Sequence, residues 1–391
     1  MTGDAMNAQL ERIDTAADPC LESAAVVDGD VVLRWRGAGA VTRLSPMWLR
    51  DHCQCAACRH PETHQRLLMS VLAIPADAGV AALAIEDGGR SLRIDWRPDG
   101  HVGRYRASLF AGLRAEPDVL PVRRRLWEAA DLYAEVPSVP YEAFLASDDV
   151  LREFLESVLA VGFCFVEGAP GTPEATRAVG DRIAYTRATV FGGYYDFSAN
   201  LERKDTAYTS LAIGAHTDST YSFDAPGYQM FHCLAAECTG GENVLIDGFR
   251  VAEDMRRDHP EDFDVLTRVA VPGQYIEPDR GIHLMARRPI FRLGEDGELL
   301  QMSYNNHDRA PMLLPRATEA AFYRALGTLA RLLADARYAY RRRLLPGSVL
   351  LFDNWRVLHA RDAYTGYRRL AGLYLNKEDI DSRLRALRAR A

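Results

Sequence analysis

Three cysteines, Cys53, Cys55 and Cys58, lie within six residues, and this cluster constrains how the N-terminal part of the chain can fold. The total of seven cysteines is odd and the first twenty residues contain no apolar signal segment, so we expect reduced thiols and not a disulfide framework. Three thiolates and one imidazole suit a tetrahedral Zn²⁺ ion, whose binding would contribute folding energy. Four histidines compete for the fourth position: His52, His60, His64 and His101. The alternative is a set of unrelated buried or free thiols.

Short alternating segments around this cluster predict a small β-rich domain. Val31–Trp35 and Leu92–Trp96 both alternate apolar and polar residues, as half-buried strands do. His101 directly follows the turn after the second segment, so as a zinc ligand it would tie two parts of the domain together. The stretch 117–140 contains four prolines and predicts a linker. We therefore predict two domains, over residues 1–120 and 121–391.

The rest of the chain predicts a mostly antiparallel β-barrel flanked by helices. Helical spacing extends over Tyr141–Ala160, with Ser147 as a candidate N-cap. Further helices are predicted at Glu174–Ile183, Val251–Met255 and Thr318–Ala336, and strands at Phe163–Val166, Val349–Phe352 and Arg369–Tyr374.

Charge and hydropathy exclude two classes of partner. The formal net charge of −7 leaves no excess of lysine and arginine for phosphate groups, so we expect no nucleic-acid binding. The longest apolar stretch, near Val71–Ile85, is interrupted by Pro75 and Asp77 and is too short to span a bilayer. We expect a cytoplasmic protein that does not bind membranes.

His216 and Asp218 are the candidate centre of the second domain. Two residues apart on an extended segment, they point to the same side of the chain. With one more histidine they would form the two-histidine, one-carboxylate site of non-haem Fe(II) oxygenases. The pattern alone is weak, because His60-Pro-Glu62 and His259-Pro-Glu261 match it too. The downstream candidate is His359, which follows a predicted strand and a turn.

Arg368 begins an apolar strand nine residues after His359. An arginine that enters a barrel needs an anion, and a planar carboxylate offers a bidentate match. Alternation along the strand does not say whether Arg368 faces inward. Asp353 and Arg356 are expected to hold the turn before His359 by hydrogen bonds, and a solvated surface loop is the alternative.

In this order, His216, Asp218, His359 and Arg368 resemble the 2-oxoglutarate-dependent Fe(II) oxygenases. The cysteine-rich module ahead of them makes the chain similar to the γ-butyrobetaine and trimethyllysine hydroxylases of carnitine biosynthesis. The matching stretches, from Trp48 to the C-terminus, are WLRDHCQCAAC, DTAYT, HTDSTY, TGGENVLIDGF, YNNHDRA, DNWRVLHARDAYTGYR and LAGLYL.

The resemblance implies a mainly β fold with flanking helices, a double-stranded β-helix (jelly-roll) oxygenase core after a small zinc-binding domain. It implies Fe(II) bound by His216, Asp218 and His359, and 2-oxoglutarate bound by Arg368. Oxidative decarboxylation of 2-oxoglutarate to succinate and CO₂ would accompany hydroxylation of an unactivated C–H bond by O₂. A homodimer is implied, with ascorbate as a candidate cofactor. The zinc ligands carry over as Cys53, Cys55, Cys58 and His101.

Four aromatic residues resemble the cage with which the family binds a quaternary ammonium group: Phe191, Tyr195, Tyr208 and Tyr374. Ordinary core packing is the alternative for each of them taken alone. Phe191 departs from the family, which commonly has a tyrosine there.

Asp205, eleven residues before His216, separates the two activities. The trimethyllysine enzymes resemble this chain in having an aspartate at this position, whereas the butyrobetaine enzymes have an asparagine. An aspartate would pair with the α-ammonium of trimethyllysine and repel a lone carboxylate; a surface acid is the alternative. We therefore predict hydroxylation of N6-trimethyllysine to 3-hydroxy-N6-trimethyllysine. The alternatives are γ-butyrobetaine hydroxylation to carnitine and a catalytically silent metal- or ligand-binding module.

Overall fold

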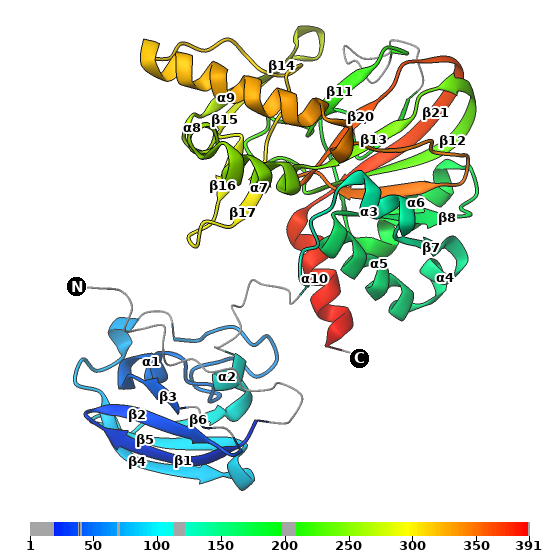
Figure 1. The fold of residues 1–391 in the computed structure, drawn as a ribbon. Helices are drawn as coiled ribbons and strands as arrows, with labels where there is room; N and C mark the ends of the chain where they lie inside the picture. The colour runs from blue at the N-terminus through cyan, green and yellow to red at the C-terminus, as the bar shows by residue number, and fades with distance from the viewer. Residues whose placement is uncertain are drawn as a thin grey trace. The chain divides into compact units, whose positions relative to one another are not determined.

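The structure, a computed structural model, describes residues 19–37, 39, 41–68, 71–112, 122–197 and 209–389. The chain divides into two compact units, Met1–Leu120 and Pro121–Ala391 (Figure 1). Within these described ranges, no helix is long and apolar enough to cross a membrane. The predicted site residues Asp205 and Tyr208 lie outside the described residues.

The N-terminal unit contains two three-stranded antiparallel sheets, ordered β1-β2-β3 and β4-β5-β6. Their alternating side chains share one core: Val31, Leu33 and Trp35 of β2 pack with the apolar residues of β5, and both segments were predicted as strands. Cys53 and Cys58 are buried in the same core. The elements are β1 (Leu21–Val27), β2 (Asp30–Trp35), β3 (Val41–Leu44), α1 (Pro46–Asp51), β4 (Gly79–Glu86), β5 (Ser91–Arg97), β6 (Val102–Arg106) and α2 (Ala107–Gly112).

Two sheets form the centre of the second unit. The larger has the order β10-β21-β12-β19-β8-β7, with β9 also paired to β21, and the smaller has the order β11-β20-β13-β18. All of these pairs are antiparallel except β7 with β8. The strands are β7 (Ser138–Pro140), β8 (Phe163–Glu167), β9 (Thr186–Arg187), β10 (Tyr194–Phe197), β11 (Ile213–His216), β12 (Tyr228–Gly240), β13 (Asn243–Asp247), β18 (Tyr340–Arg342), β19 (Val349–Asp353), β20 (Val357–Arg361) and β21 (Tyr364–Leu375).

One apolar core joins these two sheets. Phe163, Phe231 and Phe352 of the larger sheet meet Leu245 and Val357 of the smaller one. The core is therefore a pair of sheets packed face to face, which agrees with the predicted mainly β class. Two hairpins are added to it, β14 (Val271–Glu277) with β15 (Ile282–Arg288) and β16 (Phe291–Leu293) with β17 (Leu299–Met302).

Helices cover the second unit. The four predicted helical segments all fall on helices, whereas the helices Ala129–Ala134, Pro260–Arg268 and Lys377–Arg388 were not predicted. A second core packs α7, α8 and α9 against the smaller sheet and the β16–β17 hairpin. The predicted helix over Tyr141–Ala160 is in fact two helices, because Ser147 leaves the helical conformation and its Oγ accepts the N–H of Val150 at 3.4 Å. The helices are α3 (Ala129–Ala134), α4 (Tyr141–Ala146), α5 (Asp148–Val161), α6 (Pro173–Ile183), α7 (Gly248–Asp258), α8 (Pro260–Arg268), α9 (Arg316–Ala334) and α10 (Lys377–Arg388).

The linker predicted over 117–140 is wrong for residues 122–140. Trp127 is buried, and its Nε1 donates to the carbonyl of Val161 at 2.7 Å. Its backbone N–H donates to Asp247 at 3.2 Å, and α3 follows at once. Prolines indicated an exposed segment, but a buried indole with a partner for its N–H fixes this segment to the second unit.

Candidate functional site

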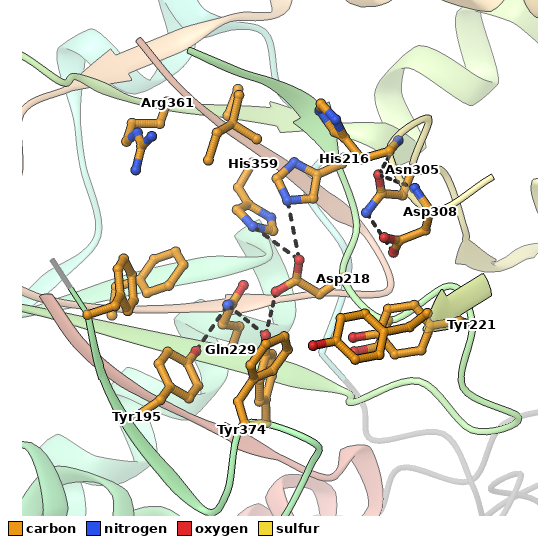
Figure 2. A pocket seen from close by; sticks show the side chains of 18 of the residues that line it. Tyr195, His216, Asp218, Tyr221, Gln229, Asn305, Asp308, His359, Arg361 and Tyr374 are labelled. Carbon is orange, nitrogen blue, oxygen red and sulfur yellow. Dashed lines mark hydrogen bonds and ion pairs between the residues drawn. The ribbon is translucent and has the colours of Figure 1, made fainter. Parts of the chain in front are cut away.

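His216 and His359 face each other across two paired strands. They occupy opposite positions in the antiparallel register of β11 and β20, and their ring centroids are 4.1 Å apart (Figure 2). Asp218 follows β11, with its Oδ1 3.3 Å from His216 Nε2 and 3.6 Å from His359 Nε2. The three candidate ligand atoms lie within 4.8 Å of one another, which is compact enough for one metal ion.

Outer hydrogen bonds orient this group. His216 Nδ1 lies 2.8 Å from the carbonyl of Gly214, to which it can donate, so Nε2 is left for a metal. The hydroxyl of Tyr374 donates to Asp218 Oδ2 at 2.7 Å. The backbone N–H of Asp218 donates to Asn354 at 2.7 Å. Imidazoles and carboxylates that bind a metal commonly make a further hydrogen bond of this kind to the protein. The group of His216, Asp218 and His359 therefore fits a bound divalent cation.

Charges in the group also suit a cation. Burial alone would raise the pKa of Asp218, but the adjacent imidazoles of His359 and His216 outweigh it and hold the pKa well below its ordinary value. Burial and the neighbouring His216 lower the pKa of His359 to about 3. Burial would also lower the pKa of His216, but the hydrogen bond and the charge of Asp218 outweigh burial and raise the pKa of this imidazole. At neutral pH the site therefore offers an ionised carboxylate and an uncharged His359, the states that bind metal.

The other two His-x-acid pairs do not form such a group. His60 Nδ1 accepts the backbone N–H groups of Glu62 and Thr63, both at 3.2 Å, and so closes a turn. His259 lies between α7 and α8. Neither histidine belongs to a potential metal-binding group within the part of the chain that the structure describes.

A cavity of about 400 Å³ opens beside the metal group. Of the predicted cage residues, Phe191, Tyr195 and Tyr374 line it, and the last two rings are 5.3 Å apart. The Tyr195 ring packs over Gly372, where a Cβ atom would lie 2.6 Å from it. Further lining residues that the sequence analysis did not single out include Tyr221, Gln229, Asn243, Tyr275, Asn305, His307, Asp308 and Arg361.

Arg368 is buried, but it is not among the residues that line the cavity. Its Nη2 donates to Asn243 Oδ1 at 2.7 Å, and Asn243 does line the cavity. Burial, together with the charge of Arg368, lowers the pKa of the nearby Arg361 to about 10. Two buried guanidinium groups near one cavity wall favour an anionic ligand there.

The sequence indicated some of the additional lining residues more clearly than others. Asn305 and Asp308 fall within the motif YNNHDRA, which was quoted without a role for either. Asp308 Oδ2 accepts from Asn305 Nδ2 at 2.9 Å, so the motif forms a polar corner of the cavity. Gln229 is a lone amide in the apolar strand β12, and a buried polar residue of that kind indicates a specific hydrogen-bonding role.

The cysteine cluster forms a second potential metal-binding group. His101 Nε2 lies 3.2 Å from Cys53 Sγ, 3.6 Å from Cys55 Sγ and 3.7 Å from Cys58 Sγ. The other candidates for the fourth position are placed elsewhere: His52 stacks on Trp48 and His60 closes its turn. Of the competing histidines, His101 is the one grouped with the three thiols.

Burial and hydrogen bonds together set the charges of this second group. Burial raises the pKa of Cys53 to about 12 and lowers that of His101, whereas hydrogen bonds to Cys55 outweigh its burial and lower the pKa of that thiol. Arg50 reaches Cys58 Sγ at 3.5 Å and Asp99 at 3.1 Å, and the backbone N–H of His101 donates to the same aspartate. Four soft donors held together in this way fit a Zn²⁺ ion.

A two-histidine, one-carboxylate group beside a cavity, in paired antiparallel sheets, defines the class of non-haem iron oxygenases. Residues 124–374 match the family described as "Taurine catabolism dioxygenase TauD, TfdA family", and residues 26–110 match "Gamma-butyrobetaine hydroxylase-like, N-terminal". The chain belongs to the TauD/TfdA family and is a 2-oxoglutarate-dependent dioxygenase, so the predicted resemblance is confirmed.

Several similar proteins align with most of the chain. The trimethyllysine dioxygenase of Meyerozyma guilliermondii is 36% identical over 385 residues, covering 92% of this chain and 94% of the relative. The mitochondrial trimethyllysine dioxygenase of Gallus gallus is 38% identical over 363 residues, covering 91% and 86%. The gamma-butyrobetaine dioxygenase of Pseudomonas sp. is 31% identical over 376 residues, covering 94% and 96%.

Proposed function

We propose that this enzyme hydroxylates N6-trimethyllysine to 3-hydroxy-N6-trimethyllysine, using Fe(II), 2-oxoglutarate and O₂. The observation that carries the proposal is a cavity in which the His216–Asp218–His359 group lies beside the aromatic rings of Tyr195 and Tyr374. A quaternary ammonium group cannot donate hydrogen bonds, and aromatic faces bind it by cation–π attraction. The similar trimethyllysine dioxygenases support the same substrate.

In this proposal His216, Asp218 and His359 hold Fe(II). When bound, the metal and 2-oxoglutarate supply the oxidising chemistry that hydroxylates an unactivated C–H bond. The chain positions the substrate: aromatic rings fix the trimethylammonium end, and the apolar residues of the lining, Phe197, Ile213 and Phe231 among them, limit the access of water to the reacting carbon. Arg368 is proposed to bind the far carboxylate of 2-oxoglutarate, with Asn243 holding the guanidinium in place.

Succinate release from 2-oxoglutarate, measured with Fe(II) and each candidate amine, tests the proposal. We expect turnover with N6-trimethyllysine and a hydroxylated product by mass spectrometry. Preferential turnover of γ-butyrobetaine would support the alternative substrate, to which the Pseudomonas relative points. Absence of turnover with both amines would support a catalytically silent binding module.

Asp205→Asn is expected to change which substrate is preferred. We propose that Asp205 pairs with the α-ammonium of trimethyllysine, a group that γ-butyrobetaine lacks. Losing a paired charge in a binding site costs about 2 kcal/mol or more, so kcat/KM for trimethyllysine should fall roughly 30-fold. Steady-state kinetics with both substrates check this, and γ-butyrobetaine is the internal control. An equal loss with both substrates would contradict the proposed role.

We propose a structural Zn(II) ion on Cys53, Cys55, Cys58 and His101. Cys58→Ser is expected to lower the zinc content and the melting temperature of the N-terminal unit, by roughly 10 °C for a loss of about 2 kcal/mol in a domain of this size. Calorimetry and metal analysis measure both effects, and Cys20→Ser, a cysteine outside the group, is the matched control. An unchanged melting profile after loss of zinc would contradict a structural role.

Three further features belong to the same proposal. A homodimer is expected from the resemblance, and light scattering at defined protein concentration would test it. Ascorbate is proposed as a cofactor that sustains turnover. The cytoplasmic location stays a prediction, and the name of the Gallus gallus relative places that protein in mitochondria.

A further inference from the structure

Gln229 connects the aromatic wall of the cavity with the metal-binding carboxylate. It lies on β12, directly opposite Tyr374 of β21, and only 3% of its surface is exposed. Its Nε2 donates to the hydroxyl of Tyr195 at 3.0 Å and to the hydroxyl of Tyr374 at 3.1 Å. Tyr374 in turn donates to Asp218 Oδ2 at 2.7 Å, so three hydrogen bonds form one continuous chain (Figure 2).

Proton counting fixes the orientation of this amide. A phenol carries one hydrogen, and that of Tyr374 faces the carboxylate of Asp218, which can only accept. The oxygen of Tyr374 must therefore meet a donor on its other side, and the Nε2 of Gln229 is the donor placed there. If the amide were reversed, its oxygen would face a phenol oxygen with no hydrogen left to share. In the orientation that pairs Nε2 with both phenol oxygens, the amide oxygen has no partner within the described residues.

We infer that Gln229 is a positioning residue: by donating to both phenol oxygens it commits the Tyr374 hydroxyl to Asp218 and sets the two rings relative to the metal. The inference rests on the proposed function only where it concerns substrate binding. Its two consequences are separable. Hydrogen bonds to a metal-ligating carboxylate support metal affinity, and the two rings, with centroids 5.3 Å apart, both line the cavity. A single amide thereby links where the metal is held to where the substrate lies.

Metal affinity tests the first consequence without any substrate. Mn(II) is the probe, because carboxylate and imidazole ligands suit it and thiolates do not, so the cysteine group does not compete. Free Mn(II) is measured by electron paramagnetic resonance during titration of the metal-free protein. We expect Tyr374→Phe, which keeps the ring, to weaken Mn(II) binding by about 10- to 100-fold, and Gln229→Met to weaken it by about tenfold.

The double variant decides whether the two residues act through one hydrogen bond. Gln229→Met combined with Tyr374→Phe should bind Mn(II) as Tyr374→Phe alone does, because the amide has nothing left to orient. Gln301→Met is the matched control: Gln301 is equally buried, at 3%, on β17 and does not line the cavity, so its Mn(II) affinity should match the wild type. Losses that multiply in the double variant, or an unchanged affinity in Gln229→Met, would overturn the inference.

Kinetics test the second consequence. Gln229→Met should raise the KM for N6-trimethyllysine, measured at saturating Fe(II), because Tyr195 and Tyr374 lose their common donor. An unchanged KM would overturn this part. If the wild-type enzyme fails to turn over trimethyllysine, the proposed function fails, whereas the Mn(II) result still decides the role of Gln229.

Discussion

Asp218→Ala is expected to abolish succinate release, lowering kcat by about a thousandfold or more, since a bound metal supplies several kcal/mol of transition-state stabilisation. Asp218 is the one carboxylate in the group, and its Oδ1 lies within 3.6 Å of both imidazole Nε2 atoms. Without it two neutral ligands remain, and the positive charge of the metal is no longer balanced. Turnover of 2-oxoglutarate and Mn(II) binding, measured on the same preparation, check the loss.

The matched control for this prediction is Asp264→Ala. Asp264 lies on α8 and forms a half-exposed ion pair with Arg268, so its removal should leave turnover unchanged. Retention of turnover within about tenfold of the wild type in Asp218→Ala would show that the carboxylate does not hold the catalytic metal.

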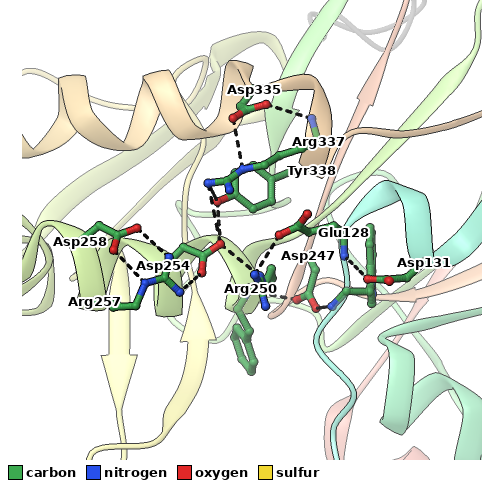
Figure 3. A network of polar contacts seen from close by, with 12 residues as sticks. Glu128, Asp131, Asp247, Arg250, Asp254, Arg257, Asp258, Asp335, Arg337 and Tyr338 are labelled. Atoms are coloured by element: carbon green, nitrogen blue, oxygen red, sulfur yellow. Dashed lines mark hydrogen bonds and ion pairs between the residues drawn. The ribbon is translucent and has the colours of Figure 1, made fainter.

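Asp247→Ala is expected to destabilise the second unit by about 3–5 kcal/mol, because it leaves a buried guanidinium without its counter-charge. Asp247 and Arg356 are 0% and 1% exposed and form two hydrogen bonds, at 3.0 and 2.8 Å. Asp247 also accepts the backbone N–H groups of Trp127 and Phe249, so its removal frees those donors as well. The Glu128–Arg250 pair, at 2.8 Å, lies beside it (Figure 3).

Urea unfolding measures this loss of stability. Hydrogen exchange in peptides of the second unit shows that the loss lies in that unit. Asp258→Ala is the control, since Asp258 is exposed and pairs with Arg257 on the surface. Adding Arg356→Met to Asp247→Ala should recover part of the stability by removing the stranded charge. A free energy of unfolding close to that of the wild type in Asp247→Ala would contradict the assigned role of the pair.

The grouping of His216, Asp218 and His359 could be predicted in part from local features of the sequence. His216 and Asp218 are two positions apart, and His359 follows a strand that the sequence also predicts. Arg356 was expected to hold the turn before His359 or to lie in a solvated loop. It is buried and forms an ion pair with Asp247, so the solvated loop is excluded. Nothing local could identify Asp247 as its partner, because the pairing depends on the register of β13 with β20.

Gln229 and the segment around Trp127 show why the rest could not be predicted. Whether a lone glutamine in an apolar strand meets two phenols is decided by β12, β10 and β21 together, and strand order is a property of the whole sheet. The prolines near Trp127 indicated a linker, but the partner for its indole N–H is Val161, more than thirty positions away. Tertiary contacts of this kind override local composition.

The position of β21 has a consequence for how the protein is made. This strand, the last one within the described residues, lies between β10 and β12, which are synthesised long before it, and β20 completes the potential metal-binding group just ahead of it. A chain still emerging from the ribosome therefore has a gap in the middle of its larger sheet and lacks His359. Pairing of such distant segments is slow, because the intervening chain must be closed into a loop first. A product truncated before β20 therefore lacks both the central strand β21 of the larger sheet and the His359 side chain of the potential metal-binding group.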